Sequence, residues 1–300
     1  MLKIAFSPLY SHSLPAGHRF PMEKYEFLPE QLLYEGTVKN ENFFVPGMID
    51  EHWILTSHTK PYLEKLQSLQ LSKSEIRVTG FPLSEILVKR EINILSGSVE
   101  SALFAMKYGI AMNIAGGTHH AFADRGEGFC LLNDLAITAN YLLKNNLAQK
   151  ILVIDLDVHQ GNGTAAILGN LKNVFTFSMH GEKNYPHRKE KSHFDVGLAD
   201  RTGDREYLLK LQKSLDHILS LFDPDFILYQ SGVDVLESDQ LGRLSITMEG
   251  IKERDRTVLN LAQSLNIPVM CCMGGGYSKR ISQIVEAHGQ VFRLAQEMYF

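Results

Sequence analysis

Residues 151–163 read ILVIDLDVHQGNG, and this stretch decides the fold. It begins with the aliphatic run ILVI, which is typical of a strand buried on both faces of a sheet. The run leads into acidic and imidazole side chains at Asp155, Asp157 and His159, and small or polar residues follow. The stretch therefore predicts a buried strand that carries charged side chains at its carboxyl end.

The same pattern recurs along the chain, and stretches of helical length separate its copies. The other apolar runs lie at 110–115, 174–179, 226–230 and 267–273. Apolar residues at helical spacing occupy 133–148, 204–221 and 249–265. Strands that alternate with helices predict an α/β fold, a three-layer open parallel β-sheet flanked by helices. No linker or internal repeat divides the chain, so we expect one domain over residues 1–300.

Polar side chains follow the other apolar runs as well. His119 and His120 follow the run at 110–115, Ser178, Met179 and His180 stand at the end of the run at 174–179, Asp234 follows the run at 226–230, and Tyr277 follows the run at 267–273. Ligands of open parallel sheets bind in the crevice beyond the carboxyl ends of the strands. The sequence therefore predicts that these side chains meet in one site.

Asp157, His159 and Asp234 have the residue types of a metal site. On an extended strand end, Asp157 and His159 are two residues apart and point to the same side, where both can bind one cation. Two carboxylates and one imidazole leave a position open on a zinc-like ion, which is typical of a catalytic site that activates water. The alternative is that Asp157 caps the next helix and that His159 is an ordinary surface histidine.

The adjacent histidines and the late tyrosine suit acid–base chemistry. His119 and His120 titrate near neutral pH, and Asp155 and Asn162 are candidate partners that would orient their rings. Tyr277 follows three glycines, where a phenol could donate a hydrogen bond to a forming oxyanion. A flexible loop tyrosine is the alternative.

Composition excludes several classes of protein. The chain has 300 residues, 44% hydrophobic and 21% charged, which is typical of a globular protein with a sizeable core. The net charge of -4 argues against direct nucleic acid binding.

Cysteine usage and the N-terminus indicate the compartment. Cys130, Cys271 and Cys272 are too few and too poorly spaced for a disulfide framework, which favours a reducing environment. The N-terminus lacks the apolar core of a signal peptide, and no run approaches the ~18 residues of a membrane span. We expect a cytoplasmic protein, although export by a signal-less route and the oligomeric state stay open.

Nucleotide sites and nucleophilic serine or cysteine sites are disfavoured. Neither GxGxxG nor GxxxxGK[ST] occurs at a strand-to-helix turn, no GxSxG is present, and Cys130 lacks a cysteine-hydrolase signature. The basic stretch 187–191 is predicted to be a solvated loop, with a substrate-facing rim as the alternative. The histidines predicted to be structural are His12, His18, His52, His58, His217 and His288.

Four segments resemble the motifs of the histone deacetylase superfamily, which has the arginase-deacetylase fold. They are GGTHHAFADRGEGFCLLND (116–134), IDLDVHQGNGT (154–164), QSGVDVLESDQLGRLSIT (230–247) and GGGYSKR (274–280). The resemblance covers almost the whole chain in the family's order. Several of these segments, with the N-terminal HRFPMEKY (18–25), resemble the class IV branch more than class I and imply a bacterial-type lysine deacylase.

The resemblance implies specific roles for the matching residues. Asp157, His159 and Asp234 would bind Zn2+, with Fe2+ as the alternative ion in cells. His120 would be the general base and then the general acid. Tyr277 would polarise the substrate carbonyl and stabilise the oxyanion.

Further roles are implied around this centre. His119, hydrogen-bonded to Asp155, would be the electrostatic partner of His120. A K+ ion beneath the zinc would be held by Asp155, Asp157, His159, Ser178 and the backbone of Met179.

The same resemblance implies the substrate-binding residues. Gly128 and Phe129 would line the tunnel for the acyl-lysine stem, and Gly275 and Gly276 would belong to the same substrate site. Arg19 would border an internal pocket that receives the released acid.

The sequence departs from the family pattern at two places. Asn162 stands where class I enzymes have an aspartate, so we expect a lower pKa for His120 than in class I. The segment Ser231–Asp234 replaces the commoner Ala-Gly-x-Asp and keeps the proposed ligand. The binuclear arginase branch is disfavoured because QGNG supplies no ligands for a second metal.

The implied function is a zinc-dependent deacetylase that hydrolyses N6-acetyl-lysine in proteins or peptides. The alternatives within the enzyme class are a long-chain lysine deacylase and a deacetylase of small acetylated amines. A catalytically silent acyl-lysine reader is disfavoured, because the ligand set and Tyr277 are intact.

Overall fold

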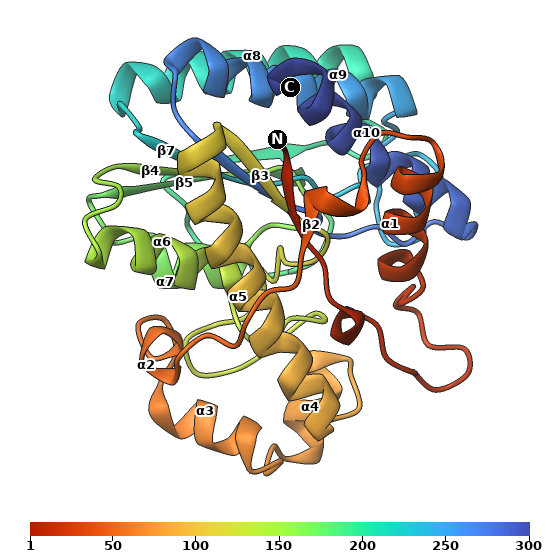
Figure 1. Cartoon of the computed structure of the whole chain (residues 1–300), viewed down its shortest axis with the longest axis vertical. Helices are drawn as coiled ribbons and strands as arrows, with labels where there is room; N and C mark the ends of the chain where they lie inside the picture. Colours follow the sequence, from red (N-terminus) through yellow and green to blue (C-terminus); the bar gives the residue numbers. More distant parts are fainter.

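One parallel sheet forms the centre of the protein in a computed structural model that describes all 300 residues (Figure 1). Its strands are β1 (Lys3–Ala5), β2 (Phe43–Phe44), β3 (Ile110–Asn113), β4 (Ile151–Asp155), β5 (Val174–Gly181), β6 (Phe194–Leu198), β7 (Phe226–Gln230) and β8 (Val269–Cys272). Their order across the sheet is β2-β1-β3-β8-β7-β4-β5-β6, and every neighbouring pair is parallel. The predicted α/β class with an open parallel sheet is confirmed.

Ten α-helices surround the sheet, and most of them form its two outer layers. They are α1 (Lys24–Tyr34), α2 (Glu51–Ile54), α3 (Lys60–Gln67), α4 (Lys73–Thr79), α5 (Glu85–Tyr108), α6 (Asp134–Lys144), α7 (Asn162–Leu168), α8 (Asp204–Leu221), α9 (Met248–Leu265) and α10 (Ile281–Tyr299). Figure 1 shows α8 and α9 over one face of the sheet and α6 and α7 over the other. Helix α10 packs against α9, and α5 packs against α6, so both faces of the sheet are covered.

Coverage on both faces explains the sequence of the central strands. Every residue of β3, β4, β7 and β8 is buried, which requires the continuous apolar runs rather than an alternating pattern. The edge strand β6 alternates between more and less buried residues, and for this reason it carries no continuous apolar run.

The N-terminal third lies partly outside this sandwich. Helix α5 begins near α3 and α4, which lie beyond the edge of the sheet, and it ends just before β3 (Figure 1). Ser72 and Glu75 form a capping box at the start of α4, and Gly80 ends that helix in the left-handed conformation (φ 79°). The end of α4 lies beside the carboxyl ends of the central strands, because Arg77 and Gly80 line the same cavity as His120 and His159.

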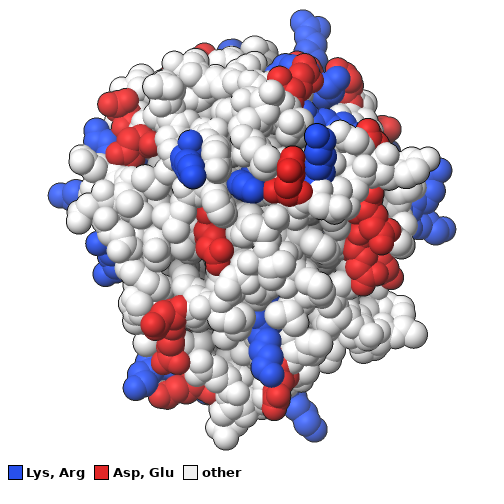
Figure 2. Space-filling model, viewed as in Figure 1, with Lys and Arg blue, Asp and Glu red and all other residues white.

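No helix combines the length and apolar character needed to cross a bilayer. Figure 2 shows Lys and Arg interspersed with Asp and Glu on one face of the molecule, without a broad field of one sign. This distribution agrees with the nearly balanced count of 30 basic and 34 acidic residues.

Candidate active site

The four central strands, β3, β8, β7 and β4, bring the candidate residues to one edge of the sheet. Each strand ends before a loop that carries a predicted site residue, and the strands are neighbours in the sheet. Strands β3 and β4 come earlier in the sequence, and β8 and β7 lie between them in the sheet. This arrangement leaves the crevice at the carboxyl ends where ligands of parallel sheets bind.

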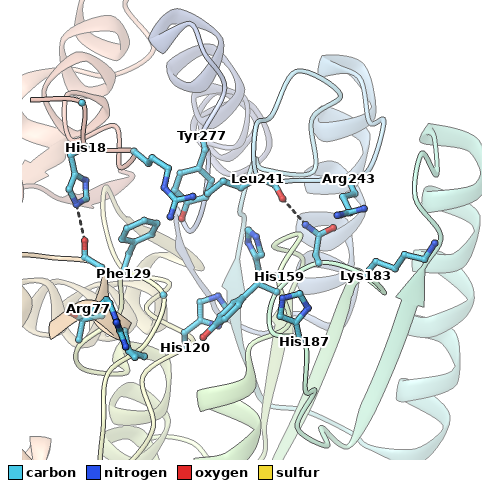
Figure 3. A pocket seen from close by; sticks show the side chains of 18 residues that line it. His18, Arg77, His120, Phe129, His159, Lys183, His187, Leu241, Arg243 and Tyr277 are labelled. Atoms are coloured by element: carbon cyan, nitrogen blue, oxygen red, sulfur yellow. Dashed lines mark hydrogen bonds between the residues drawn. The ribbon is translucent and has the colours of Figure 1, made fainter. Parts of the chain in front are cut away.

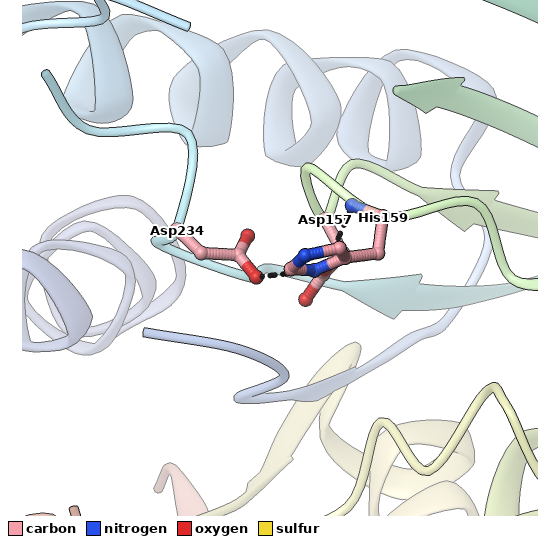
Figure 4. Close-up of side chains that lie close together, drawn as sticks. All are labelled: Asp157, His159 and Asp234. Atoms are coloured by element: carbon pink, nitrogen blue, oxygen red, sulfur yellow. Dashed lines mark hydrogen bonds and ion pairs between the residues drawn. The ribbon is translucent and has the colours of Figure 1, made fainter. Parts of the chain in front are cut away.

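Asp157, His159 and Asp234 form a buried cluster at this edge (Figure 4). The Nδ1 atom of His159 lies 3.1 Å from Oδ1 of Asp157 and 3.0 Å from Oδ2 of Asp234. The potential ligand atoms all lie within 4.8 Å of one another, so one cation can contact all three. The predicted convergence of these residues is therefore present.

The electrostatics of the cluster fit a metal ion. Burial lowers the pKa of His159, but the hydrogen bonds and charges of Asp157 and Asp234 outweigh burial and raise that pKa to about 10. Burial and the neighbouring Asp157 raise the pKa of Asp234 to about 7. Burial raises the pKa of Asp157, but the charge of His119 and the hydrogen bond to His159 outweigh burial and hold that pKa well below its ordinary value, so Asp234 is the carboxylate that lacks a full positive partner in the protein itself. A divalent cation bound by the three side chains would supply that charge.

His119 and His120 lie beside this cluster with their rings 4.1 Å apart. Nδ1 of His119 lies 2.7 Å from Asp155 Oδ2, and Nδ1 of His120 lies 2.6 Å from Asn162 Oδ1. Both predicted orienting partners are therefore in place. Each ring has its Nδ1 engaged, which fixes its orientation.

The pKa values of the two histidines are shifted in opposite directions. Burial lowers the pKa of His119, but the Asp155 and Asp157 carboxylates outweigh burial and raise it above its ordinary value. Burial and the neighbouring His119 and His159 lower the pKa of His120 well below its ordinary value, and the amide of Asn162 opposes this only in part. The arrangement favours the charged form of His119 and the neutral form of His120, and a neutral imidazole can accept a proton.

Tyr277 completes the centre from the loop after β8. Its backbone N–H donates to Oδ2 of Asp239 at 2.6 Å, and its ring centroid lies 6.3 Å from that of His159. Burial, followed by the charges of Asp234 and Asp157, raises the pKa of the phenol well above its ordinary value. The phenol stays protonated and can donate a hydrogen bond.

An outer cavity of about 960 Å³ opens above these residues (Figure 3). His120, His159 and Tyr277 line it, as do Gly128 and Phe129. Gly128 has a φ of +53°, and a Cβ there would lie 2.7 Å from Cδ2 of His120. Only glycine can adopt this conformation at this distance without displacing the histidine. Gly128 and Phe129 thus lie where a substrate would enter.

The other two predicted substrate glycines lie deeper. The N–H of Gly275 donates to Asp157 Oδ2 at 2.7 Å, and a Cβ at Gly275 would lie 2.1 Å from Oδ2 of Asp234. Gly276 lines neither the outer cavity nor the internal one described below, and a Cβ there would lie 2.7 Å from Val233. The structure thus places Gly275 against the metal cluster and Gly276 in packing behind it.

A small internal cavity lies behind the histidines, lined in part by Phe20, Arg90, His119 and Gly275. Arg19 does not reach it, because Phe20 takes the inward position and Arg19 is exposed at the outer cavity. The expectation that Arg19 borders the internal pocket is wrong. The arginine at that pocket is Arg90 from α5, whose Nε donates to the carbonyl of Tyr10 at 2.8 Å.

Of the residues predicted for K+, Asp157 and His159 belong to the cluster itself, and the other three lie on the neighbouring strands β4 and β5. Asp155 pairs in register with Ser178 across β4 and β5, and Met179 follows in β5. The backbone N–H of Asp157 donates to Asp155 Oδ1 at 3.2 Å, so the two acidic side chains belong to one turn.

The chain matches the family model of the histone deacetylase domain over residues 18–292. It is 30% identical over 282 residues to Histone deacetylase 2 of Arabidopsis thaliana, a match that covers 89% of this chain and 72% of the plant protein. The chain belongs to the histone deacetylase family. An uncharacterized protein of Picosynechococcus sp. is 40% identical over 296 residues, 99% of each chain. An HDAC homologue from Aquifex aeolicus, at 22% identity, matches with a TM-score of 0.84 over 99% of this chain and 84% of that chain, which shows the same fold.

Several residues of this histone deacetylase family member were not predicted from its sequence. Nε2 of Gln230 lies 3.0 Å from His119 Nδ1, and Asp239 accepts the N–H of Tyr277. The ring of Tyr185 lies 4.9 Å from that of His120, and His18, predicted to be structural, lines the outer cavity. Gln230 ends a strand, which was a usable signal. The positions of Tyr185 and His18 depend on loops from distant parts of the chain.

Proposed function

We propose that this protein is a zinc-dependent amidohydrolase that removes the acetyl group from N6-acetyl-lysine in proteins or peptides. The observation that carries the proposal is the joint placement of the Asp157, His159 and Asp234 cluster, His120 and Tyr277 at the base of one open cavity. Membership in the histone deacetylase family supports a hydrolase. Amide hydrolysis needs an activated water, a proton carrier and an oxyanion donor, and these residues match all three.

Asp157, His159 and Asp234 would hold the zinc ion. When bound, zinc lowers the pKa of water and polarises a carbonyl. His120 is neutral, and its Nδ1 is engaged by Asn162, so its Nε2 accepts the proton of the attacking water. The same atom then donates that proton to the departing ε-amine of lysine. His119, whose pKa is raised and whose Nδ1 pairs with Asp155, would balance the carboxylates without taking part in the transfer.

Tyr277 stabilises the negative charge that develops on the carbonyl oxygen. Its raised pKa keeps the phenol protonated, and the bond from its N–H to Asp239 positions its loop. Replacing Tyr277 by Phe should lower kcat by about 10²-fold or more on an acetyl-lysine peptide. The hydroxyl of Tyr185 already donates to Glu127 at 2.7 Å, and we therefore expect a much smaller loss of kcat in Tyr185→Phe. Equal losses in the two variants would remove Tyr277 from the oxyanion role.

The length of the acyl chain can be tested directly. One lysine peptide would carry acetyl, butyryl, octanoyl or myristoyl groups, and an acetylated polyamine would represent small amines. The proposal predicts the highest kcat/KM for the acetyl peptide. A maximum at myristoyl would instead identify a long-chain deacylase, and no hydrolysis of any compound would remove the proposal.

We propose K+ as a second ion, held by Asp155, Asp157, His159, Ser178 and the backbone of Met179. The in-register pairing of Asp155 with Ser178 supports this set, because it brings a carboxylate and a hydroxyl together. We also propose a reducing, cytoplasmic setting. The three cysteines are free and buried, which supports it.

A further inference from the structure

The outer cavity is bordered by basic side chains. Its lining includes Arg19, Arg77, Lys183 and Arg243, here called the cationic rim, and it contains no Asp or Glu. All four side chains are exposed. This concentration stands out in a chain whose net charge is -4.

The rim residues come from four separate segments. Arg19 lies in the N-terminal loop and Arg77 in the last turn of α4, while Lys183 follows β5 and Arg243 lies in the long loop after β7. Figure 3 shows Arg77 on one side of His120 and His159, with Lys183 and Arg243 on the other. The positive charges therefore lie on both sides of the entrance instead of forming one patch beside it.

Little of this charge is neutralised by the protein. Asp200 lies 3.8 Å from Lys183 and 3.3 Å from Arg243, so one carboxylate serves two cations. Glu127, near the entrance, is paired with Arg125 at 2.8 Å and accepts the hydroxyl of Tyr185. No ion pair involves Arg19 or Arg77, so the rim keeps an excess of positive charge.

Not every cation of this region contributes. Nζ of Lys189 donates to the carbonyl oxygens of Asn184 and Pro186, both at 2.6 Å, and Lys189 does not line the cavity. In the basic stretch 187–191, only His187 reaches the cavity. Lys189 therefore holds the loop, and the four rim residues supply the charge at the entrance.

We propose that the cationic rim selects acyl-lysine residues flanked by Asp or Glu in the substrate peptide. This inference rests on the proposed function, because it concerns the substrate of that site. An acylated lysine is itself neutral, so the charge that the rim meets comes from the flanking residues. Carboxylates there are attracted, whereas the Lys and Arg of a histone-like tail, or the amines of a polyamine, are repelled.

Three peptides test the proposal. They share one central acetyl-lysine and carry Asp, Ala or Arg at the flanking positions. At low ionic strength we expect kcat/KM to fall in that order, with about tenfold or more between the extremes. The ratio should shrink toward one at 1 M salt, where the Debye length is about 3 Å. Equal values at low salt, or a preference for the Arg peptide, would overturn the proposal.

Charge reversal locates the effect. Arg77→Glu should lower the ratio of kcat/KM for the Asp peptide to kcat/KM for the Arg peptide by about threefold or more. Arg77→Gln should lower this ratio by a smaller factor, and this variant avoids a new acidic group at the end of α4. Lys213→Glu, an exposed position in α8 outside the cavity, makes the same change in net charge. An equal drop of this ratio in Lys213→Glu would show that the net charge of the protein, and not the cationic rim, determines the preference for the Asp peptide.

Binding separates this proposal from the proposed function. Fluorescence anisotropy would give Kd for the three labelled peptides whether or not they are hydrolysed. If the Ala peptide is not hydrolysed but the Asp peptide binds most tightly, the proposed function is rejected and the proposal for the cationic rim is kept. If the Ala peptide is hydrolysed and all three bind equally, the rim proposal fails alone.

Discussion

Asn162 sets the environment of the proposed general base. Its side-chain oxygen lies 2.6 Å from Nδ1 of His120, and it is neutral where an aspartate would be charged. In Asn162→Asp the added negative charge favours the imidazolium form, so the pKa of His120 rises. A base must be neutral to accept a proton, so the acidic limb of the kcat/KM profile should move to higher pH, by about 1 unit or more.

The measurement is the pH profile of kcat/KM on an acetyl-lysine peptide. A profile that keeps its acidic limb in Asn162→Asp would show that His120 does not control that limb. Far-ultraviolet circular dichroism over the same pH range would separate this result from acid unfolding.

The placement of a residue in the site was predictable where the residue follows a strand that ends at the site. Asp157 and Asp234 follow long apolar runs, and their meeting follows from parallel strands that end at one edge. Arg19 shows the limit. In a loop without periodicity, a one-residue difference decides whether Arg19 or Phe20 points inward, and only packing selects between them.

At the scale of elements, α9 positions the loops that carry the proposed ligands. Arg254 is fully buried and donates to the carbonyl oxygens of Leu156, Ser231 and Gly232, besides its ion pair with Asp255 at 2.8 Å. Two of these carbonyls lie in the loop after β7 and the third just before Asp157. One guanidinium therefore connects both loops of the metal cluster.

Arg254→Met should cost about 3–5 kcal/mol of unfolding free energy, because it leaves Asp255 and the carbonyls buried without partners. It should also weaken metal binding, which a merely distant core change would not do. Arg256→Met, on the same helix with a partly exposed ion pair to Glu253, should cost about 1 kcal/mol or less. Urea denaturation and zinc titration of both variants check this. Unchanged zinc affinity in folded Arg254→Met would contradict the positioning role.

The long apolar strands were predictable as elements, and the short ones were not. The run at 226–230 is β7 to the residue, and the runs at 110–115 and 151–158 contain β3 and β4. Strands β1 and β2 have three and two residues, too few to show a period, and their pairing depends on partners elsewhere in the chain.

At the scale of the molecule, the order of the strands in the sheet could not be predicted from the sequence. The pairs β3–β8 and β4–β7 join segments far apart in the chain, and nothing local specifies them. We propose that residues 1–300 form one catalytic domain, supported by a sheet that takes strands from Lys3 to Cys272. Net charge misleads at this scale too, because -4 for the chain coexists with a cationic rim at the cavity.

The proposed amide hydrolysis depends on a metal ion that the buried Asp157, His159 and Asp234 cluster would hold. The direct test is hydrolysis of an acetyl-lysine peptide by protein stripped with a chelator and then titrated with Zn2+. We predict loss of activity on stripping and recovery that saturates near one zinc per chain, with no recovery in Asp234→Asn. Full turnover by protein shown to be free of metal would contradict the claim.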